Sequence, residues 1–360
     1  MGSGPLCALV LPSFAGGGAE RVMLMMAAML PARGIATELV VLDGEGPLRA
    51  TVSPQVPTVV LGKPRMRDAI AAVARHLQSR RPDLVLSSFG HVTAALAAIM
   101  AAMRPRPRLV AREPNLPSLS MAGGGINRWL RLACRLAYPR CDLVIASSHR
   151  MAAELEEDYH VLHERLLVLP NPVDEAHIRA RAADTVDAPP CRRLFVASGR
   201  MVPQKGFDRL IAIWPQMRDD DILVLLGDGT ERQRLEQEAA SSGLSARVLF
   251  RGYEDNPWAW YARANALLVP SRFEGLPNAA LEALACGTPV IATPESGGLA
   301  ELAPAVPGNH LRIVAANDFP GAIEGSASAR GSLRPSLLPS QFSAEDSVAA
   351  LADRLMALPV

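Results

Sequence analysis

Residues 267–293 read LLVPSRFEGLPNAALEALACGTPVIAT. An apolar run up to Pro270 is followed by a loop with Gly275 and Pro277, by helix-forming residues that end at Gly287, and by a second apolar run. This order predicts a strand, a loop, a helix, a turn and a second strand, which together make one βαβ unit. In parallel α/β sheets, ligands bind at the loop between strand and helix, where free backbone N–H groups meet anions. The stretch therefore predicts an α/β protein with a ligand site in this loop.

Two carboxylates belong to this segment. Glu274 lies in the loop, and Glu282 lies one turn into the helix, four residues after Asn278 and on the same face. Carboxylates would repel a bound phosphate, so we expect them to bind sugar hydroxyls while backbone amides and a cation hold the phosphate charge. The alternative is a solvated helix face, because surface helices carry many glutamates.

A second unit of this kind opens the chain. Residues 6–12 are apolar, residues 13–19 form a loop with the sequence SFAGGGA, and residues 20–30 have helical spacing. Three glycines between a strand and a helix let a ligand approach the backbone and offer amides to an anion. The loop is not a dinucleotide-binding fingerprint, because Arg21 stands where the third glycine should be. A tight turn without a ligand is the alternative.

A loop with two cations follows the strand predicted at residues 192–198. Arg200 and Lys205 can converge on one diphosphate, the arginine as a planar fork and the lysine as a point charge. The chain holds 37 Lys+Arg, and Lys63 and Lys205 are its two lysines. A lysine kept against this bias toward arginine favours a function for Lys205 over a merely solvated loop.

These segments together resemble retaining GT-B glycosyltransferases, especially glycosyltransferase family 4. The resemblance rests on the pattern EG-x-P-N-x-x-x-E-A-x-A-x-G-x-P-V-I-A from Glu274, on GGGAERV from Gly16, and on the loop from Arg200 to Lys205. It covers most of the chain and is most specific within residues 10–21 and 170–301.

The resemblance implies a GT-B fold, in which two Rossmann-like α/β domains face each other across a cleft. We expect an N-terminal acceptor domain at residues 1–173, a C-terminal nucleotide-sugar donor domain at 174–342, and a terminal helix at 343–360 that packs back on the first domain. The NPVD run at 171–174 is similar to the hinge between the domains.

The activity implied is transfer of a hexosyl group from a nucleotide diphosphate sugar to an acceptor hydroxyl, in bacterial polysaccharide, glycolipid or glycan assembly. Arg200, Lys205 and the amides ahead of Glu282 would stabilise the charge on the leaving diphosphate, so neither a metal nor a cofactor is expected. Glu274 would hold the transferred sugar, and Glu282 the ribose hydroxyls. The leaving phosphate oxygen would accept the proton of the acceptor.

Further positions implied by the resemblance lie in the turns after strands. For the donor these are Gly17, Gly18, Gly199, Asp228, Gly252, Tyr253, Gly275, Leu276, Asn278 and Ala279. Many family members carry a histidine near the strand predicted at 109–111, and none stands there in this chain. We expect the acceptor side to use His91, Arg112 or Glu113 in its place.

Two other functions fit the same motifs. A nucleotide-sugar epimerase on this fold would need an acid and base at the sugar and no acceptor. A binding protein that keeps the donor site but has lost turnover would also fit, because the expected histidine is missing. Hydrolysis or epimerisation of the donor alone would favour the first, and donor-dependent labelling of an acceptor would exclude the second.

Composition favours a globular cytoplasmic protein without a nucleic-acid partner. With 360 residues the chain is long enough for two domains, each with its own core. The five cysteines form no C-x-x-C pair and fit reduced thiols. No apolar stretch is long enough to cross a bilayer, and no basic segment precedes the first apolar run. Residues 1–174 hold 19 Lys+Arg against 14 Asp+Glu, so this half is the one suited to an anionic surface.

Two more segments carry charge. Residues 126–140 place Arg128, Arg131 and Arg135 on one side of a helix, with Trp129 and other apolar residues over much of the rest. Such a helix suits a lipid interface, or it packs on the sheet with a solvated basic side. Residues 219–221 are three aspartates that precede a strand, so we expect a solvated turn at the amino edge of a sheet, away from the site.

Overall fold

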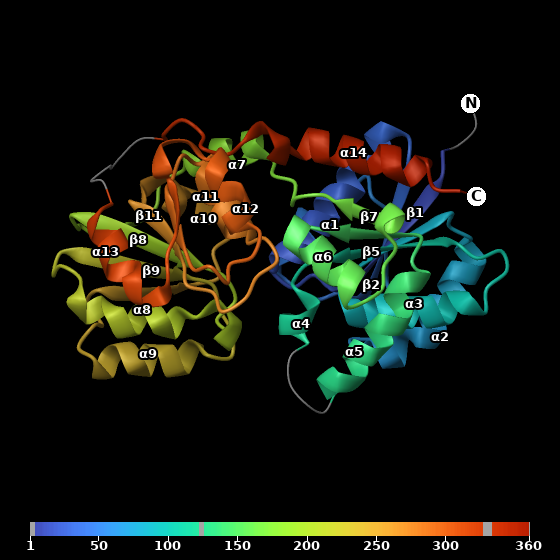
Figure 1. Ribbon diagram of the computed structural model, residues 1–360, viewed down its shortest axis with the longest axis horizontal. Helices are drawn as coiled ribbons and strands as arrows, with labels where there is room; N and C mark the ends of the chain where they lie inside the picture. Colours follow the sequence, from blue (N-terminus) through green and yellow to red (C-terminus); the bar gives the residue numbers. More distant parts are fainter. Residues whose placement is uncertain (1–3, 122–125, 327–332, 360) are drawn as a thin grey trace. The chain divides into compact units, whose positions relative to one another are not determined.

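The computed structural model describes residues 4–121, 126–326 and 333–359. The chain divides into two compact units (Figure 1): Met1–Pro172 together with Ala344–Val360, and Val173–Ser343. Each unit holds one parallel β-sheet with helices on both of its faces. The predicted α/β class and parallel sheets are therefore confirmed.

The first unit contains a seven-stranded sheet in the order β3-β2-β1-β4-β5-β6-β7, with parallel pairing throughout. Its strands are β1 (Leu6–Ser13), β2 (Ala36–Asp43), β3 (Thr58–Val60), β4 (Leu84–Ser88), β5 (Arg108–Glu113), β6 (Leu143–Ala146) and β7 (Leu166–Val168). Its α-helices are α1 (Gly18–Met29), α2 (Met66–Arg80), α3 (Gly90–Ala101), α4 (Pro117–Ser120), α5 (Ile126–Ala137), α6 (His149–Glu157) and α14 (Ala344–Met356).

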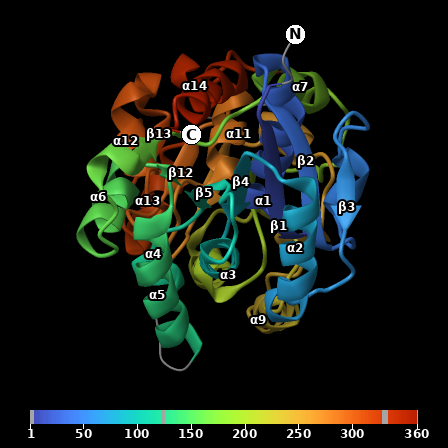
Figure 2. The same ribbon diagram turned by 90° about the vertical axis from the view of Figure 1, so that its right-hand side faces the viewer.

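Alternating side chains of β1 serve two cores. Leu9 and Leu11 pack with α1 and with the terminal helix α14, whereas Ala8 and Val10 pack with α2, α3, α5 and α6. Burial on both faces explains the continuous apolar run, because a strand covered by helices on both sides has no solvent face. Figure 2 shows α2 and α3 beside the strands of this sheet. The apolar side of α14, with Leu351 fully buried, belongs to the first unit.

The second unit contains a six-stranded parallel sheet in the order β10-β9-β8-β11-β12-β13. Its strands are β8 (Arg193–Ser198), β9 (Asp221–Leu226), β10 (Val248–Gly252), β11 (Ala266–Val269), β12 (Val290–Ala292) and β13 (Leu311–Ile313). Its α-helices are α7 (Glu175–Ala182), α8 (Phe207–Ile213), α9 (Arg232–Ser241), α10 (Pro257–Arg263), α11 (Asn278–Ala285), α12 (Leu299–Leu302) and α13 (Phe319–Glu324).

Helices cover both faces of this sheet as well. On one face α7, α10, α11 and α12 pack with Leu194, Val196 and Leu267 (Figure 1). On the other face α8, α9 and α13 pack with Phe195 and Leu223. The segment quoted first forms β11, a loop, α11 and β12, as predicted.

One prediction for this unit was wrong in part. Residues 321–340 are rich in Gly, Ser, Ala and Pro, which predicts a loose connection, but this segment begins inside α13, because Phe319 and Ile323 give that helix an apolar side that the sheet buries. Residues 327–332 of that connection lie outside the described residues. The aromatic segment 253–261, in which Trp258 and Trp260 are more typical of packing than of stacking on a base, includes the first residues of the helix α10, and both tryptophans pack in the core of the unit.

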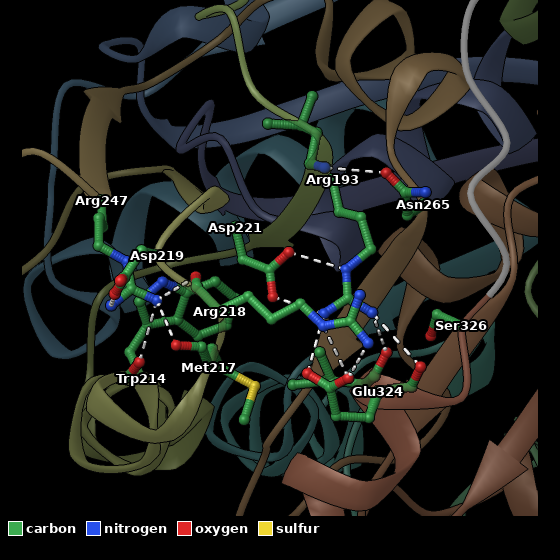
Figure 3. A network of polar contacts seen from close by, with 12 residues as sticks. Arg193, Trp214, Met217, Arg218, Asp219, Asp221, Arg247, Asn265, Glu324 and Ser326 are labelled. Atoms are coloured by element: carbon green, nitrogen blue, oxygen red, sulfur yellow. Dashed lines mark hydrogen bonds and ion pairs between the residues drawn. The ribbon is translucent and has the colours of Figure 1, made fainter.

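The three aspartates also differ from the expected solvated turn. Asp219 is exposed, but Asp221 is the first residue of β9 and is fully buried. Its carboxylate binds Arg193 at the start of β8 through two hydrogen bonds of 2.7 and 2.6 Å (Figure 3). Arg193 also contacts Glu324 at 3.1 Å, which pairs with Arg218 at 2.6 Å. Asp221 therefore serves a buried ion pair that ties α13 to the amino end of the sheet.

Candidate active site

Both sheets reverse their strand order next to the first strand of the unit. In the second unit β9 and β10 lie on one side of β8, while β11, β12 and β13 lie on the other. At such a point the two loops that leave the carboxyl ends of the central strands diverge, which leaves a crevice for ligands. The loop after β8 contains Lys205, and the loop after β11 contains Glu274. The topology brings together two residues that lie 69 positions apart.

Lys205 and Glu274 form an ion pair at this point. The Nζ atom of Lys205 lies 2.5 Å from Oε1 of Glu274, and the hydroxyl of Ser271 donates to the same oxygen at 2.9 Å. The side chain of Glu274 is 6 % exposed and that of Lys205 is 21 % exposed. The lysine stem packs against the backbone, since a Cβ added at Gly199 would lie 3.0 Å from Cε of Lys205. The pair is therefore largely enclosed by the two loops that it joins.

The backbone fixes the distance between these loops. Gly206 has a left-handed conformation with φ 66°, and an added Cβ there would lie 2.3 Å from the carbonyl oxygen of Pro270. Only glycine permits both features without strain. The amide of Arg272 also donates to the carbonyl of Gln204 at 2.7 Å. These contacts hold Lys205 next to the loop that carries Glu274.

A third loop supports Glu274 from the other side. The amide of Glu274 donates to the carbonyl of Glu295 at 3.1 Å, and the amide of Gly298 donates to the carbonyl of Gly275 at 2.7 Å. Gly297 has φ 64°, and an added Cβ would lie 2.2 Å from the carbonyl oxygen of Gly275. The segment 295–298 after β12 therefore holds the backbone of the glutamate loop in place.

Helix α11 follows this loop directly. It begins at Asn278 after Pro277, so its first turn, with Ala279 and its positive dipole end, adjoins the loop of Glu274 and Gly275. Leu276 is buried in the apolar core of the unit, so we expect its backbone to serve any ligand. This geometry suits an anion in contact with backbone amides.

Glu282 lies in the same helix with a different partner. Its Oε2 atom accepts a hydrogen bond of 3.0 Å from Nε1 of Trp258 in α10. The sequence does not predict this bond, because nothing in the spacing indicates which indole N–H reaches a carboxylate. The two glutamates of the motif thus have unlike environments, one beside an ammonium and the other beside an indole.

The remaining donor positions of the second unit lie at the same edge of the sheet. Asp228 follows β9, and its exposed carboxylate accepts from the amide of Gly229 at 2.7 Å, which lowers its pKa. Gly252 ends β10 and is followed by Tyr253, which is 41 % exposed. Arg200 is exposed in the loop after β8. Their contacts with a donor stay predictions.

The predicted residues of the first unit also lie at the carboxyl ends of its central strands. Gly17 and Gly18 open α1 after β1, and the exposed His91 lies in the first turn of α3 after β4. Phe89, just before α3, has φ 104°. A bulky residue in that conformation is strained, and such strain is most often kept at functional sites.

Arg112 and Glu113 have internal partners. The guanidinium of Arg112 is buried and donates to Asn171 at 2.5 Å, and burial lowers its pKa to about 10. Glu113 is also buried and accepts a hydrogen bond from the hydroxyl of Tyr138. Burial raises the pKa of Glu113 to about 7. A role for either residue toward an acceptor stays a prediction.

Comparison with known protein families covers both halves of the chain. Residues 16–177 match the family model described as Glycosyltransferase Family 4, and residues 192–327 match the model described as Glycosyl transferases group 1. The chain belongs to glycosyltransferase family 4.

Curated relatives of this family 4 chain act in glycan assembly. An N-acetylgalactosamine-N,N'-diacetylbacillosaminyl-diphospho-undecaprenol 4-alpha-N-acetylgalactosaminyltransferase of Campylobacter jejuni is 27% identical over 57% of this chain and 56% of the relative. A lipopolysaccharide core biosynthesis glycosyltransferase, LpsE of Rhizobium meliloti, is 28% identical over 78% of this chain and 77% of the relative. The chain thus spans about half to three quarters of the length of these two relatives.

Solved structures share the fold. A crystal structure of Anabaena Alr3699/HepE in complex with UDP-glucose superposes with a TM-score of 0.71 at 20% identity, covering 97% of this chain and 94% of that chain. This likeness shows the fold, and the two parallel α/β sheets are those of a GT-B glycosyltransferase. The predicted GT-B class is confirmed.

Proposed function

We propose that this family 4 chain transfers a hexosyl group from a nucleoside-diphosphate sugar to an acceptor hydroxyl with retention of anomeric configuration. The observation that carries the proposal is the enclosed pair of Lys205 and Glu274 at the strand-order reversal, next to the N-terminus of α11. A cation, a carboxylate and oriented amides in one crevice match the needs of a diphosphate joined to a sugar.

The reaction breaks the bond between the anomeric carbon and the diphosphate oxygen, and it forms a bond from that carbon to the acceptor oxygen on the same face. The acceptor proton moves to the leaving phosphate oxygen. Lys205, Arg200 and the first amides of α11 stabilise the charge that grows on the diphosphate. An ammonium group has three donors, so Lys205 has the capacity to bind Glu274 and a phosphate oxygen together.

The two glutamates take different parts of the donor in this proposal. Glu274 accepts hydrogen bonds from the hydroxyls of the transferred sugar and lies beside the cation that faces the diphosphate. Glu282, in α11, accepts from the ribose hydroxyls of the nucleotide that leaves.

A glycosyltransferase of the cell envelope is the most specific setting that we propose. The Campylobacter relative is named for transfer to a diphospho-undecaprenol-linked sugar, and the Rhizobium relative for lipopolysaccharide core biosynthesis. Anabaena HepE was solved with UDP-glucose. A lipid-linked or saccharide acceptor and a uridine nucleotide are therefore the first to test, in a protein that acts at the cytoplasmic face of the membrane.

The test begins with a thermal-shift screen of nucleoside diphosphates and their sugars, with UDP first. A stabilising donor is then incubated with lipid-linked and saccharide acceptors, and a mass increase of one hexosyl unit is measured. Transfer to an acceptor is the expected result. Epimerised or hydrolysed donor without transfer would support the epimerase, and donor binding without any turnover would support the binding protein.

Helix α5 favours peripheral contact of the first unit with an anionic lipid surface. We define the α5 surface as the exposed residues Arg128, Trp129, Leu132, Arg135 and Leu136. Trp129 is 70% exposed and Leu136 is 56% exposed. Such apolar side chains beside arginines are typical of interfacial helices, because they insert between lipids while the guanidinium groups meet phosphates. Among the described residues no helix is long and apolar enough to span a membrane.

The structure changes which residues this surface includes. Arg131, which the sequence placed with Arg128 and Arg135, is half-buried and donates to the carbonyl of Met121 at 3.0 Å. Charge reversal at Arg131 would therefore disturb folding as well as lipid contact. A variant that replaces the three apolar residues of the α5 surface tests lipid contact more specifically, because these side chains are exposed.

Cosedimentation with vesicles that contain phosphatidylglycerol tests the surface. Replacing Trp129, Leu132 and Leu136 by Ser should abolish binding and leave donor binding unchanged. The matched control replaces Val60 and Ile70, which are 42% and 44% exposed in the same unit, and should bind like the wild type. Equal binding by all three proteins would show that α5 is an ordinary helix with a solvated side.

A further inference from the structure

We infer that Trp258 is a positioning residue that orients Glu282 for the nucleotide and so sets donor affinity without touching the donor. The inference rests on the proposed function, because it takes Glu282 to be the carboxylate that binds the ribose. It deepens that proposal by assigning a role to a residue of α10 outside the glutamate motif.

The indole of Trp258 is an internal group. Trp258 is 6% exposed and belongs to the apolar core that α7, α10 and α11 form against the sheet. The ring of His177 from α7 packs edge-on against it, with centroids 5.2 Å apart and planes at 85°. A ring enclosed in this way cannot stack on a nucleotide base, so its effect on the donor must act through a neighbour.

That neighbour is Glu282. Nε1 of Trp258 donates to Oε2 of Glu282 at 3.0 Å, which is a normal length for this bond. A carboxylate offers about four lone-pair sites on two oxygens, and the bond to the indole occupies one of them. The bond therefore selects one orientation of the carboxylate.

The backbone keeps the indole in register with Glu282. Cys286, one turn beyond Glu282 in α11, directs its thiol toward the carbonyl of Trp258 at 3.8 Å. Further along, the hydroxyl of Thr288 donates to the carbonyl of Tyr261 at 2.6 Å. Two contacts between α10 and the end of α11 thus fix the position from which Trp258 reaches the carboxylate.

The indole of Trp258 is a neutral hydrogen-bond donor to Glu282. A neutral N–H donor restrains the carboxylate without cancelling its charge, whereas an ammonium neutralises it. The bond from Trp258 therefore orients Glu282 without adding a cation of its own.

The decisive experiment measures affinity for the nucleoside diphosphate that the wild type binds, by calorimetry. Trp258→Phe keeps an aromatic ring and removes the donor, so Kd should rise by about tenfold, because a carboxylate that is no longer oriented loses its charge-assisted bond to a ribose hydroxyl. The KM for the donor should rise in parallel while kcat at saturation changes by less than about threefold, because Lys205 and Glu274 are untouched.

The matched control is Trp214→Phe. Trp214 is fully buried in the same unit, and its Nε1 has no hydrogen-bond partner among the described residues. Both variants lose the same atoms from a buried ring, and circular dichroism should show that both are folded. Only Trp258→Phe should lose diphosphate affinity. Equal affinities for the two variants would overturn the inference.

A double-mutant cycle tests whether Trp258 acts through Glu282. In a Glu282→Ala background, Trp258→Phe should cause no further loss of affinity, since the group that it orients is gone. An undiminished loss in that background would also overturn the inference. If the wild type binds no nucleoside diphosphate at all, the proposed function fails instead, which is a distinct result.

A spectroscopic measurement covers the case in which Trp258→Phe does not fold. The chain has four tryptophans, so the indole N–H region of an ¹⁵N spectrum holds few signals, which Phe substitutions at the other three assign. The Trp258 signal should move in Glu282→Gln and on titration with the diphosphate. A signal that is insensitive to both changes would refute a bond between the two side chains in solution.

Discussion

Replacing Lys205 by Met tests the proposed site most directly. The change keeps most of the apolar stem that packs on Gly199 and removes the ammonium that lies 2.5 Å from Glu274. A cation that contacts the leaving diphosphate contributes about 1.5–3 kcal/mol to its stabilisation. Each 1.4 kcal/mol is a factor of about ten. We therefore expect kcat/KM to fall by at least about tenfold.

The same change should also lower stability. The side chain of Glu274 is 6 % exposed, and in the absence of Lys205 the hydroxyl of Ser271, at 2.9 Å, would still donate to its carboxylate. Removing one member of a buried ion pair costs about 3–5 kcal/mol, and the 21 % exposure of Lys205 reduces the expected loss to roughly 1–3 kcal/mol. Glu274→Gln should relieve much of this loss, so the two changes should not be additive.

Initial rates and urea unfolding measure the two effects. Arg218→Met is the matched control, because it breaks a pair of 2.6 Å with Glu324 in the same unit, beside the Arg193–Asp221 pair at the amino ends of the strands. We expect its kcat/KM to match the wild type. Turnover near the wild-type value in Lys205→Met, with the protein folded, would refute the diphosphate contact.

Three more predictions follow from the site and from the first unit. Glu274→Gln should lower kcat strongly with little change in calorimetric affinity for free diphosphate, whereas Glu282→Gln should weaken that affinity by roughly 1–3 kcal/mol; the opposite result would exchange the two roles. Transfer should be undiminished by EDTA, and loss with EDTA that manganese restores would contradict the proposed electrostatic mechanism. Burial raises the pKa of Glu113 from 4.5 to about 7, so the unfolding free energy should fall as pH rises from about 4.5 to 7, by up to about 3 kcal/mol. Glu113→Gln should flatten this dependence in urea unfolding, and parallel profiles of the two proteins would contradict it.

The sequence predicted the strands and the loops that carry the site, because those signals are local. An apolar run followed by a glycine-rich or proline-rich loop and then helical spacing identifies a strand end, wherever the strand lies in the sheet. Helix α11 and the strand β12 were predicted within a few residues from such local cues. The strand end predicted for Lys205 was also correct, since that residue lies in the loop after β8.

Partners could not be predicted in the same way. Asp221 looked like part of a solvated turn because charged residues in a row are most often exposed, and only the adjacency of β8 and β9 places Arg193 within 2.6 Å of its carboxylate. Trp258 looked like a packing residue, because aromatic side chains in an apolar segment most often pack in a core. Strand order and helix pairing decide these contacts, and neither is visible in the spacing of a single segment.

The fold places the two glutamates of the motif in different environments. Glu274 lies in the loop and Glu282 in the helix that follows, with seven residues between them. Both positions carry the same side chain. The strand order gives Glu274 a lysine from the loop after the neighbouring strand, and the helix order gives Glu282 an indole from α10. A carboxylate paired with an ammonium lies where the negative charge of a ligand can share the cation, which supports the proposed contact of Glu274 beside the bond between sugar and phosphate. The indole orients the Glu282 carboxylate without adding a charge of its own, which supports the proposed contact with the ribose. The topology of the sheet therefore gives different environments to two residues that are alike in the motif, and these environments support the two proposed roles.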